Sequence, residues 1–342
     1  MRVLIVDDSM LIRSILRSLL ESFGYEIAGE EGNGKKGVEA ARRLRPNLIL
    51  MDINMPEMNG ITATGIIMKE NPIPIVIFTS ENIGEVGYKA LNNGALEIIP
   101  KPDIHQMNDK KFKLELKTIL DNISKFGEIK LGTRTDNRVP TFPAAGKVQK
   151  SKYAKKRRCR LVVIGASTGG PSAVRTLLSE LPAGFPTPII VTQHIEEGFD
   201  TGYAEWLNEA TELKIRIAKP LDRITPGEVI IAPATHHLIC RGTALLWDDG
   251  PRIDNQKPSV DKMFISAVKT FGSDVIGVLL TGMGRDGAKG CLEIFKCGGE
   301  TLVQNEESSM IFGMPKAAIE IGGASMIVPL TEMARELRER LM

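Results

Sequence analysis

Short apolar runs alternate with amphipathic stretches over the N-terminal third of the chain. The runs are nearly continuous in Val, Ile and Leu, which is typical of strands buried on both faces of a parallel sheet. The stretches between them space apolar residues as helices do, and the last of these helices is expected to end near Lys125. Five strands alternating with five helices predict a doubly wound α/β domain with a five-stranded parallel sheet. The expected strands are residues 2–6, 26–28, 48–51, 75–78 and 97–99.

A second α/β pattern begins at residues 161–164. Helical patterns lie between several of the later apolar runs, and residues 333–341 are expected to form a closing helix. This pattern predicts a second doubly wound α/β domain with a mostly parallel sheet. Its further expected strands are residues 188–192, 214–217, 229–232, 238–240, 275–280 and 300–304.

Between the two patterns, residues 126–158 lack apolar periodicity and end in a run of Lys and Arg without an acid. We interpret this stretch as a solvated linker, with a polyanion- or partner-binding patch as the alternative. The predicted domains are therefore residues 1–122 and 159–342, joined by a basic linker at 123–158.

Composition narrows the class of protein. The chain has 342 residues, 42% hydrophobic and 25% charged, which excludes a disordered or disulfide-stapled chain. A net charge of +2 gives no indication of nucleic acid or membrane binding. No signal peptide and no apolar run of about 20 residues is evident, so we expect a cytoplasmic protein without membrane insertion. The four cysteines, expected to be free thiols, are Cys159, Cys240, Cys291 and Cys297.

Chemistry-bearing residues follow four of the first five expected strands. Asp7 and Asp8 follow the first, Asp52 the third, Thr79 the fourth and Lys101 the fifth. Ligands bind at the carboxyl ends of the strands in an open parallel sheet. Three converging carboxylates suit Mg²⁺, and a hydroxyl and an ammonium beside them would hold a phosphoryl group. Helix and turn capping explains one or two of these positions but not the whole set.

These motifs resemble those of response-regulator receiver domains, which have a flavodoxin-like fold. The matching segments are residues 6–9, 52–60, 79–80 and 101–102. The resemblance implies that Asp52 is the phosphoacceptor and that Thr79 and Lys101 sense the phosphoryl group. One departure is Ile98, which stands where the family carries an aromatic switch residue.

The same resemblance implies the metal ligands. Asp7, Asp8 and Asp52 would hold Mg²⁺ together with the backbone carbonyl of Asn54. Magnesium is thus expected as the cofactor of phosphorylation.

In the second pattern, a G-x-S-x-G sequence centred on Ser167 lies between an apolar run and a helical pattern. This arrangement lifts a serine hydroxyl above a sheet edge, and the following helix N-terminus can stabilise an oxyanion. A glycine-rich loop after a strand also binds phosphate. The motif alone leaves both interpretations open.

A serine nucleophile needs a base and an orienting acid. His194 ends one apolar run, and Asp286 lies in the sequence TGMGRDG directly after another. Ser167, His194 and Asp286 are therefore expected on one rim of the sheet. Their order differs from the Ser, Asp, His order of α/β-hydrolases, so that fold is not implied.

The remaining histidines are interpreted as structural. His236 and His237 are adjacent, so on a strand they face opposite sides and cannot chelate one ion. One is expected to pack and the other to be solvated. His105 is expected at the surface.

The second domain resembles the catalytic domain of the chemotaxis protein-glutamate methylesterase/glutamine deamidase family, CheB. The segments that carry the resemblance are residues 164–170, 193–194, 257–261, 280–287 and 308–315. It implies the triad Ser167, His194 and Asp286, with the Met283 backbone N–H and Thr168 contributing to the oxyanion site and to orientation. The departures from the family pattern are Ile195-Glu196-Glu197, Ala234 and Asn305.

Together, the resemblances imply a phosphoprotein of two-component signalling: a phosphorylation-activated hydrolase that needs no cofactor for the esterase reaction. Its implied partners are methylated chemoreceptors as substrate and the chemotaxis histidine kinase as phosphodonor, and we expect a monomer. A DNA-binding regulator would need a compact basic module. A nucleotide-binding output domain would leave His194 and Asp286 without a role.

Overall fold

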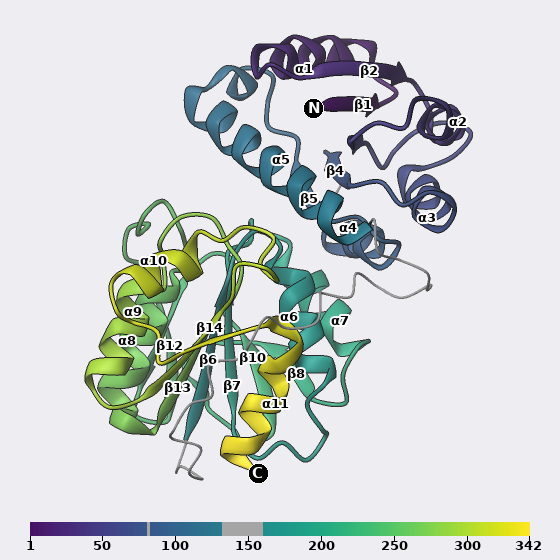
Figure 1. The fold of residues 1–342 in the computed structure, drawn as a ribbon. Coiled ribbons are helices and arrows are strands. Elements are labelled where there is room, and N and C mark those ends of the chain that lie inside the picture. Colours follow the sequence, from purple (N-terminus) through teal and green to yellow (C-terminus); the bar gives the residue numbers. More distant parts are fainter. Residues whose placement is uncertain (81–82, 132–159) are drawn as a thin grey trace. The chain divides into compact units, whose positions relative to one another are not determined.

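The computed structural model describes residues 1–80, 83–131 and 160–342, and its contacts divide the chain into two units, Met1–Thr141 and Phe142–Met342 (Figure 1). The basic run of the predicted linker and Cys159 lie outside the described residues. Within the described ranges, every helix is too short or too polar to cross a membrane.

The N-terminal unit has a five-stranded parallel sheet in the order β2-β1-β3-β4-β5, which confirms the predicted fold. Most strand residues are buried apolar side chains, as expected for strands covered on both faces. Its elements are β1 (Arg2–Val6), α1 (Met10–Ser22), β2 (Glu26–Glu31), α2 (Gly34–Leu44), β3 (Leu48–Met51), α3 (Gly60–Glu70), β4 (Ile75–Thr79), α4 (Ile83–Asn92), β5 (Glu97–Pro100), the 3₁₀ turn η1 (Gln106–Asn108) and α5 (Lys110–Leu131).

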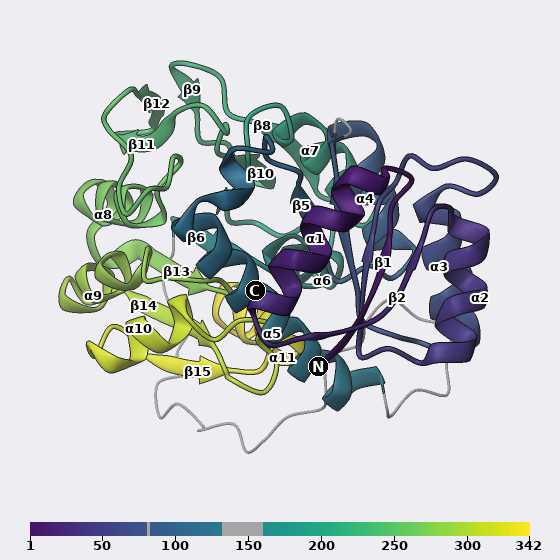
Figure 2. The same cartoon turned by 90° about the horizontal axis from the view of Figure 1, so that it is seen from above.

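Helices cover both faces of this sheet. Figure 2 shows α1 and α5 on one face and α2 and α3 on the other. Three helices begin at polar side chains that accept a backbone N–H of the first turn: Ser9 caps α1, Asn33 caps α2 and Asn59 caps α3. These caps end each strand-to-helix loop at a defined residue, and the loops after β1 and β3 carry the chemistry described below.

The end of α5 differs from the prediction. The helix continues to Leu131, whereas apolar periodicity placed its end near Lys125. Most residues between these two positions are good helix formers, with only Gly127 against them. Backbone propensity can carry a helix beyond its last clear apolar repeat, so the periodicity underestimated the length of α5.

The C-terminal unit has a seven-stranded parallel sheet in the order β15-β14-β13-β6-β7-β10-β8 and a small antiparallel sheet in the order β11-β12-β9. Its elements are β6 (Leu161–Ala166), α6 (Gly170–Ser179), β7 (Ile189–Gln193), α7 (Asp200–Asn208), β8 (Lys214–Ile217), β9 (Asp222–Arg223), β10 (Glu228–Ile231), β11 (His237–Arg241), β12 (Ala244–Asp248), α8 (Val260–Phe271), η2 (Gly272–Asp274), β13 (Val275–Leu279), α9 (Ala288–Lys296), β14 (Glu300–Gln304), α10 (Met314–Glu320), β15 (Met326–Val328) and α11 (Leu330–Leu341).

The helices form two layers around the larger sheet. In Figure 1, α6, α7 and α11 lie on one face, and α8, α9 and α10 lie on the other. The central strands β13, β6 and β7 are neighbours, and their residues are buried. The carboxyl ends of these three strands therefore lie side by side at one edge.

Candidate active site

Three carboxylates meet at the carboxyl edge of the N-terminal sheet. Asp7 and Asp8 follow β1, Asp52 follows β3, and the pairing of these strands sets Val6 opposite Met51. One carboxylate oxygen from each acid lies within 4.8 Å of the others. Asp7 and Asp52 are buried, and Asp8 is exposed. The structure brings together the three acids that the sequence singled out.

Lys101 neutralises part of this charge. Its Nζ lies 2.7 Å from Oδ2 of Asp7 and 3.0 Å from Oδ1 of Asp52. Burial raises the pKa of Asp52, Lys101 opposes this, Asp7 adds to it, and the net direction is upward. One ammonium beside three carboxylates leaves a negative site built from oxygen ligands, and this donor set fits Mg²⁺.

The other predicted residues of this site lie on the loops around the carboxylates. Thr79 is buried at the end of β4, and its carbonyl accepts the backbone N–H of Lys101 at 2.8 Å. Asn54 is exposed in the loop between Asp52 and α3. An added Cβ on Gly60 would lie 1.9 Å from the backbone oxygen of Asp52, so this loop can close only over a glycine.

Ser167 lies in the loop between β6 and α6, at the carboxyl edge of the second sheet. Its N–H donates to the carbonyl of Thr281 at 3.0 Å, and its carbonyl accepts the N–H of Gly170 at 2.7 Å. Gly169 has a φ of 73° and turns the chain into α6. An added Cβ on Gly282 would lie 2.7 Å from Cβ of Ser167. The loop after β13 therefore packs directly against the serine.

His194 and Asp286 form a hydrogen-bonded pair on the same rim. Nε2 of His194 lies 2.8 Å from Oδ2 of Asp286, and the two side chains are only 5% and 2% exposed. The backbone N–H of His194 donates to the carbonyl of Ala166, the residue before Ser167, at 3.0 Å. Nδ1 of His194 is buried and has no hydrogen-bond partner within the described part of the chain. With Nε2 engaged by Asp286, Nδ1 is the ring atom left for proton transfer.

Donors surround the Asp286 carboxylate, most of them from the N-terminal turn of α8. Burial raises the pKa of Asp286, but the hydrogen bond and charge of His194 and the backbone N–H groups of α8 outweigh it, so the pKa lies below its ordinary value. The carboxylate therefore stays charged and is able to stabilise an imidazolium. The donors are Ser259 Oγ (2.9 Å), Val260 N (2.7 Å), Asp261 N (2.9 Å) and Gly287 N (3.0 Å).

The backbone around Met283 is held from two sides. The N–H of Gly282 donates to the carbonyl of Ile311 at 3.0 Å, and the carbonyl of Gly282 accepts the N–H of Met314 at 2.9 Å. The Thr281 hydroxyl donates to the carbonyl of Thr168 at 3.1 Å. Thr168 and Met283 therefore lie on two loops that contact each other beside Ser167. Their roles in oxyanion binding and orientation remain predictions.

Gln193 and Ser259 belong to this site, although the sequence assigned them no role. Nε2 of Gln193 donates to the carbonyls of Ser167 (2.8 Å) and His194 (3.0 Å), so one amide ties both residues together. Ser259 donates to Asp286. Both residues lie in segments that carry the family resemblance, residues 193–194 and 257–261. The sequence alone did not indicate which side chains they would contact.

The other histidines behave as predicted. His237 is fully buried, whereas His236 is partly exposed, stacks on Trp247 and lies 3.0 Å from Asp249. His105 is exposed. None of the three contributes to a group of metal-ligating side chains among the described residues.

Three segments depart from the CheB pattern: Ile195-Glu196-Glu197, Ala234 and Asn305. After His194, Glu196 and Glu197 are exposed. Ala234 donates its backbone N–H to Asp200, and Asn305 accepts the Ser308 hydroxyl. These contacts leave the His194–Asp286 pair untouched.

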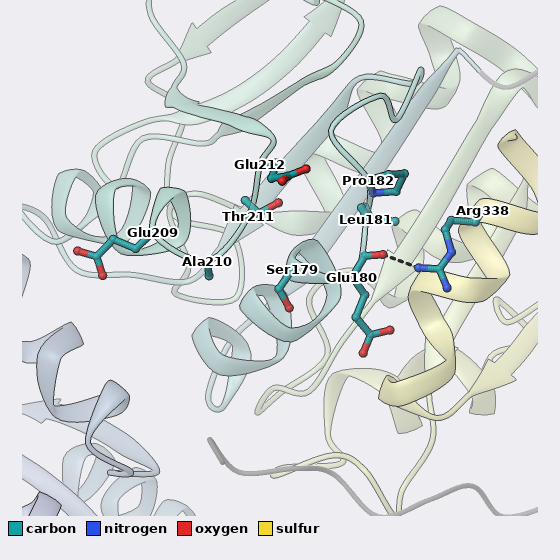
Figure 3. A pocket seen from close by; sticks show the side chains of 9 residues that line it. All are labelled: Ser179, Glu180, Leu181, Pro182, Glu209, Ala210, Thr211, Glu212 and Arg338. Atoms are coloured by element: carbon teal, nitrogen blue, oxygen red, sulfur yellow. Dashed lines mark hydrogen bonds between the residues drawn. The ribbon is translucent and has the colours of Figure 1, made fainter. Parts of the chain in front are cut away.

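A groove of about 590 Å³ lies elsewhere on the C-terminal unit (Figure 3). It is bounded by the segments that lead into β7 and β8 and by Arg338 of α11, which donates to the carbonyl of Glu180. These segments precede the strands, so the groove is at the amino edge of the sheet, opposite to Ser167. Its lining residues include none of the candidate site residues.

Comparison with known proteins agrees with this geometry. Residues 162–337 match the family model described as CheB methylesterase, and residues 3–110 match the response regulator receiver domain. The chain is 38% identical to protein-glutamate methylesterase/protein-glutamine glutaminase 2 of Anaeromyxobacter dehalogenans, covering 99% of this chain and 96% of the relative. It is 37% identical to the protein-glutamate methylesterase/protein-glutamine glutaminase of Archaeoglobus fulgidus, covering 98% and 97%.

A solved structure extends the comparison to the catalytic unit. The catalytic domain of Thermotoga maritima CheB methylesterase is 36% identical with a TM-score of 0.51, and the match covers 53% of this chain and 98% of that domain. The rim that joins Ser167, His194 and Asp286 lies within the matched family region. The chain therefore belongs to the CheB methylesterase family, with a response-regulator receiver domain preceding the catalytic domain.

Proposed function

We propose that this protein is a phosphorylation-activated protein-glutamate methylesterase that hydrolyses γ-glutamyl methyl esters on chemoreceptors and deamidates receptor glutamines. The observation that carries the proposal is the His194–Asp286 pair beside the Ser167 loop, on one rim of a CheB-family domain. Hydrolysis restores a receptor glutamate and releases methanol, which gives the protein a role in chemotactic adaptation.

In the proposed mechanism, Nδ1 of His194 takes the proton of the Ser167 hydroxyl as Oγ attacks the ester carbonyl. Asp286 holds Nε2–H of His194 and stabilises the imidazolium that forms. The imidazolium then returns its proton to the leaving methoxide, and methanol departs. Water hydrolyses the acyl-serine with His194 again acting as base. The same steps on a primary amide release ammonia.

The developing oxyanion needs donors near Ser167. The backbone N–H of Met283 is proposed for this role because Gly282 fixes the loop against the serine, with Thr168 on the opposing loop. Losing one oxyanion donor typically costs about 10²–10³ in rate.

Regulation is assigned to the N-terminal unit, with Asp52 as phosphoacceptor and Thr79 and Lys101 as the groups that respond to the phosphoryl oxygens. Asp7, Asp8, Asp52 and the carbonyl of Asn54 would hold Mg²⁺, which when bound neutralises charge around the incoming phosphoryl group.

The phosphodonor is proposed to be the chemotaxis histidine kinase, and the substrate a methylated chemoreceptor. We place the protein in the cytoplasm as a monomer that needs no cofactor for ester hydrolysis. We also retain the proposed division into a receiver domain at 1–122, a linker at 123–158 and a catalytic domain at 159–342.

Methanol release from methylated receptor membranes tests the proposed activity. The intact protein and Ser167→Ala are compared with and without a small-molecule phosphodonor and Mg²⁺. Because Ser167 supplies the nucleophilic oxygen, we expect release that rises with phosphodonor in the intact protein and is lost in the variant.

Ser179→Ala is the matched control, since Ser179 is exposed at the end of α6, away from the rim, and its hydroxyl donates to the carbonyl of Thr176 in its own helix. It should retain the full rate. Activity that survives in Ser167→Ala would overturn the triad. An inactive intact protein on a competent receptor would overturn the esterase function.

A further inference from the structure

A buried hydrogen-bonded chain lies behind Asp286. Ser259 and His237 are both 0% exposed. The Ser259 hydroxyl donates to Oδ1 of Asp286 at 2.9 Å, and the Ser259 N–H donates to Nδ1 of His237 at 3.1 Å. Nε2 of His237 lies 2.9 Å from the carbonyl oxygen of Pro251. This series of hydrogen bonds therefore runs from the loop after β12, through His237 of β11 and the N-cap of α8, to the acid that contacts His194.

The contacts of His237 determine its protonation. Nδ1 accepts an N–H and Nε2 faces a carbonyl, so the ring is neutral with its proton on Nε2. Burial lowers the pKa of His237, the Pro251 bond opposes this, and nearby charges are Lys262, Asp248 and Lys257. A neutral ring can accept the Ser259 N–H, whereas an imidazolium could not.

The orientation of the Ser259 hydroxyl is also fixed. Its oxygen accepts the N–H of Lys262 at 3.3 Å as the N-cap of α8. Because that oxygen is an acceptor toward the helix, its single proton is free to point at Asp286. Helix capping and the hydrogen bond to Asp286 therefore use different parts of one hydroxyl.

The two oxygens of Asp286 face different partners. Oδ1 accepts from Ser259, Asp261 and Gly287, whereas Oδ2 contacts His194 and the N–H of Val260. Ser259 is the one side chain that donates to Oδ1 among these contacts. It therefore sets the rotation of the carboxylate that aims Oδ2 at Nε2 of His194.

We infer that Ser259, held by neutral His237, is a positioning residue that orients and tunes Asp286 for the reaction. This inference rests on the proposed Ser-His-Asp mechanism and adds two residues to it. Ser259 is fully buried, and its hydrogen bonds within the described residues go to Asp286, His237 and Lys262, so its effect passes through Asp286 and His194.

Loss of the Ser259 hydroxyl changes the charge that His194 meets. A hydrogen bond to Oδ1 withdraws charge from the carboxylate, and without it more negative charge faces the imidazole. The charged groups around this pair are Asp261 from α8, Lys289 from α9 acting on Asp261, and exposed Glu196 and Glu197 after His194. None of them replaces the lost donor, so the acidic limb of the pH–rate profile should move to higher pH.

The test is steady-state methanol release by the full chain across pH, comparing Ser259→Ala, Ser259→Thr and His237→Gln with the unaltered protein. We expect Ser259→Ala to lower kcat roughly tenfold, the rate equivalent of one hydrogen bond to a charged group, with KM unchanged. Its acidic limb should shift to higher pH. Ser259→Thr keeps a hydroxyl and should restore both kcat and the position of the acidic limb. His237→Gln should lower kcat and move the acidic limb to higher pH, as Ser259→Ala does.

Ser266→Ala is the matched control. Ser266 lies on the same helix and accepts the N–H of Cys240 at 2.9 Å, so its loss removes a hydrogen bond without touching Asp286. It should lower thermal stability while leaving kcat and the pH profile in place. A Ser259→Ala enzyme with unchanged kcat and pH profile, or one that matches Ser266→Ala, would overturn the inference.

Failure of the proposed function is distinguishable from this result. If Ser167→Ala remains active, the triad itself is wrong; if Ser167→Ala is inactive and Ser259→Ala is normal, only the positioning role is wrong. Should Ser259→Ala fail to fold, His237→Gln carries the test, because the inference requires a lower kcat and a shifted limb there as well.

Discussion

Asp286 and Asp261 are two buried acids in contact with each other, since the backbone N–H of Asp261 donates to Asp286. Their surroundings shift their pKa values in opposite directions. Asp286 accepts from the first turn of α8 and contacts His194, and its pKa is lowered. Asp261 lies in that turn and accepts the N–H of Gly290 at 2.7 Å, but burial and the charge of Asp286 raise its pKa to about 6. Neighbouring carboxylates with separated pKa values are typical of active sites.

The raised pKa of Asp261 predicts a pH-dependent stability. The unfolded carboxyl titrates near 3.8 and the folded one near 6, so the wild-type chain loses stability as the pH rises across that interval, by about 3 kcal/mol. Asp261→Asn keeps an oxygen for the Gly290 N–H and removes the titration. We expect its Tm relative to wild type to increase between about pH 5 and about pH 8.

Thermal unfolding at both pH values measures this difference. Glu205→Gln is the control, because Glu205 is exposed on α7, outside the contacts of Asp261, and the variant should keep a Tm close to that of the wild type at both pH values. An Asp261→Asn difference that stays flat with pH would contradict the assignment.

The sequence located the residues of the proposed triad better than the residues that support them. Ser167, His194 and Asp286 each follow an apolar strand, and parallel strands end at one edge, so their meeting could be predicted. Ser259 and His237 follow no such rule. Ser259 contacts Asp286 from the start of α8, and His237 contacts Ser259 from a strand of the small sheet, so the packing of α8 against β11 brings these residues together.

At the scale of elements, the buried parallel strands were predictable and the others were not. Continuous apolar runs such as Leu48–Met51, buried along their whole length, carry their own signal. The structure adds β9, β12 and β15, which the apolar pattern did not predict. Of these, β9 has two residues and β15 has three. Periodicity over the two or three residues of β9 and β15 is uninformative, and these segments are strands because of their partners.

The loop after β13 predicts the effect of a small substitution. In Gly282→Ala, the new methyl group would lie 2.7 Å from Cβ of Ser167 and 2.3 Å from Sδ of Met314. The flexible side chain of Met314 can move aside. The Cβ of Ser167 is fixed to the backbone, so relief of that contact would displace the loop that carries the serine. We expect a loss of kcat of about 10²-fold, since a misplacement of about 1 Å costs that much.

Methanol release and thermal unfolding together check this prediction. Gly184→Ala is the matched control, because an added Cβ there meets nothing within 4 Å. It should keep both rate and Tm. A fully active Gly282→Ala enzyme would show that the contact between the two loops does not position the serine.

At the scale of the whole molecule, the carboxylate cluster of the N-terminal unit predicts how activity responds to phosphodonor. The stimulated-to-unstimulated ratio of methanol release should fall to one in Asp52→Asn and, for the unaltered chain, when EDTA removes Mg²⁺. A tenfold stimulation would correspond to about 1.4 kcal/mol of differential stabilisation.

Asp103→Asn is the control for this experiment, since Asp103 is exposed and outside the cluster. Its ratio should equal that of the unaltered chain. Stimulation that persists in Asp52→Asn would place the phosphoacceptor elsewhere and remove the regulatory link.

The order of strands in the second sheet has a consequence for synthesis. The serine and histidine follow β6 and β7, but Asp286 follows β13, which joins the sheet on the other side of β6 from far downstream in the chain. A nascent chain that has not yet been translated through β13 lacks the acid, even when β6 and β7 have paired. The proposed triad is therefore completed late, and termination between His194 and β13 yields a protein that carries the serine loop and the histidine but not Asp286.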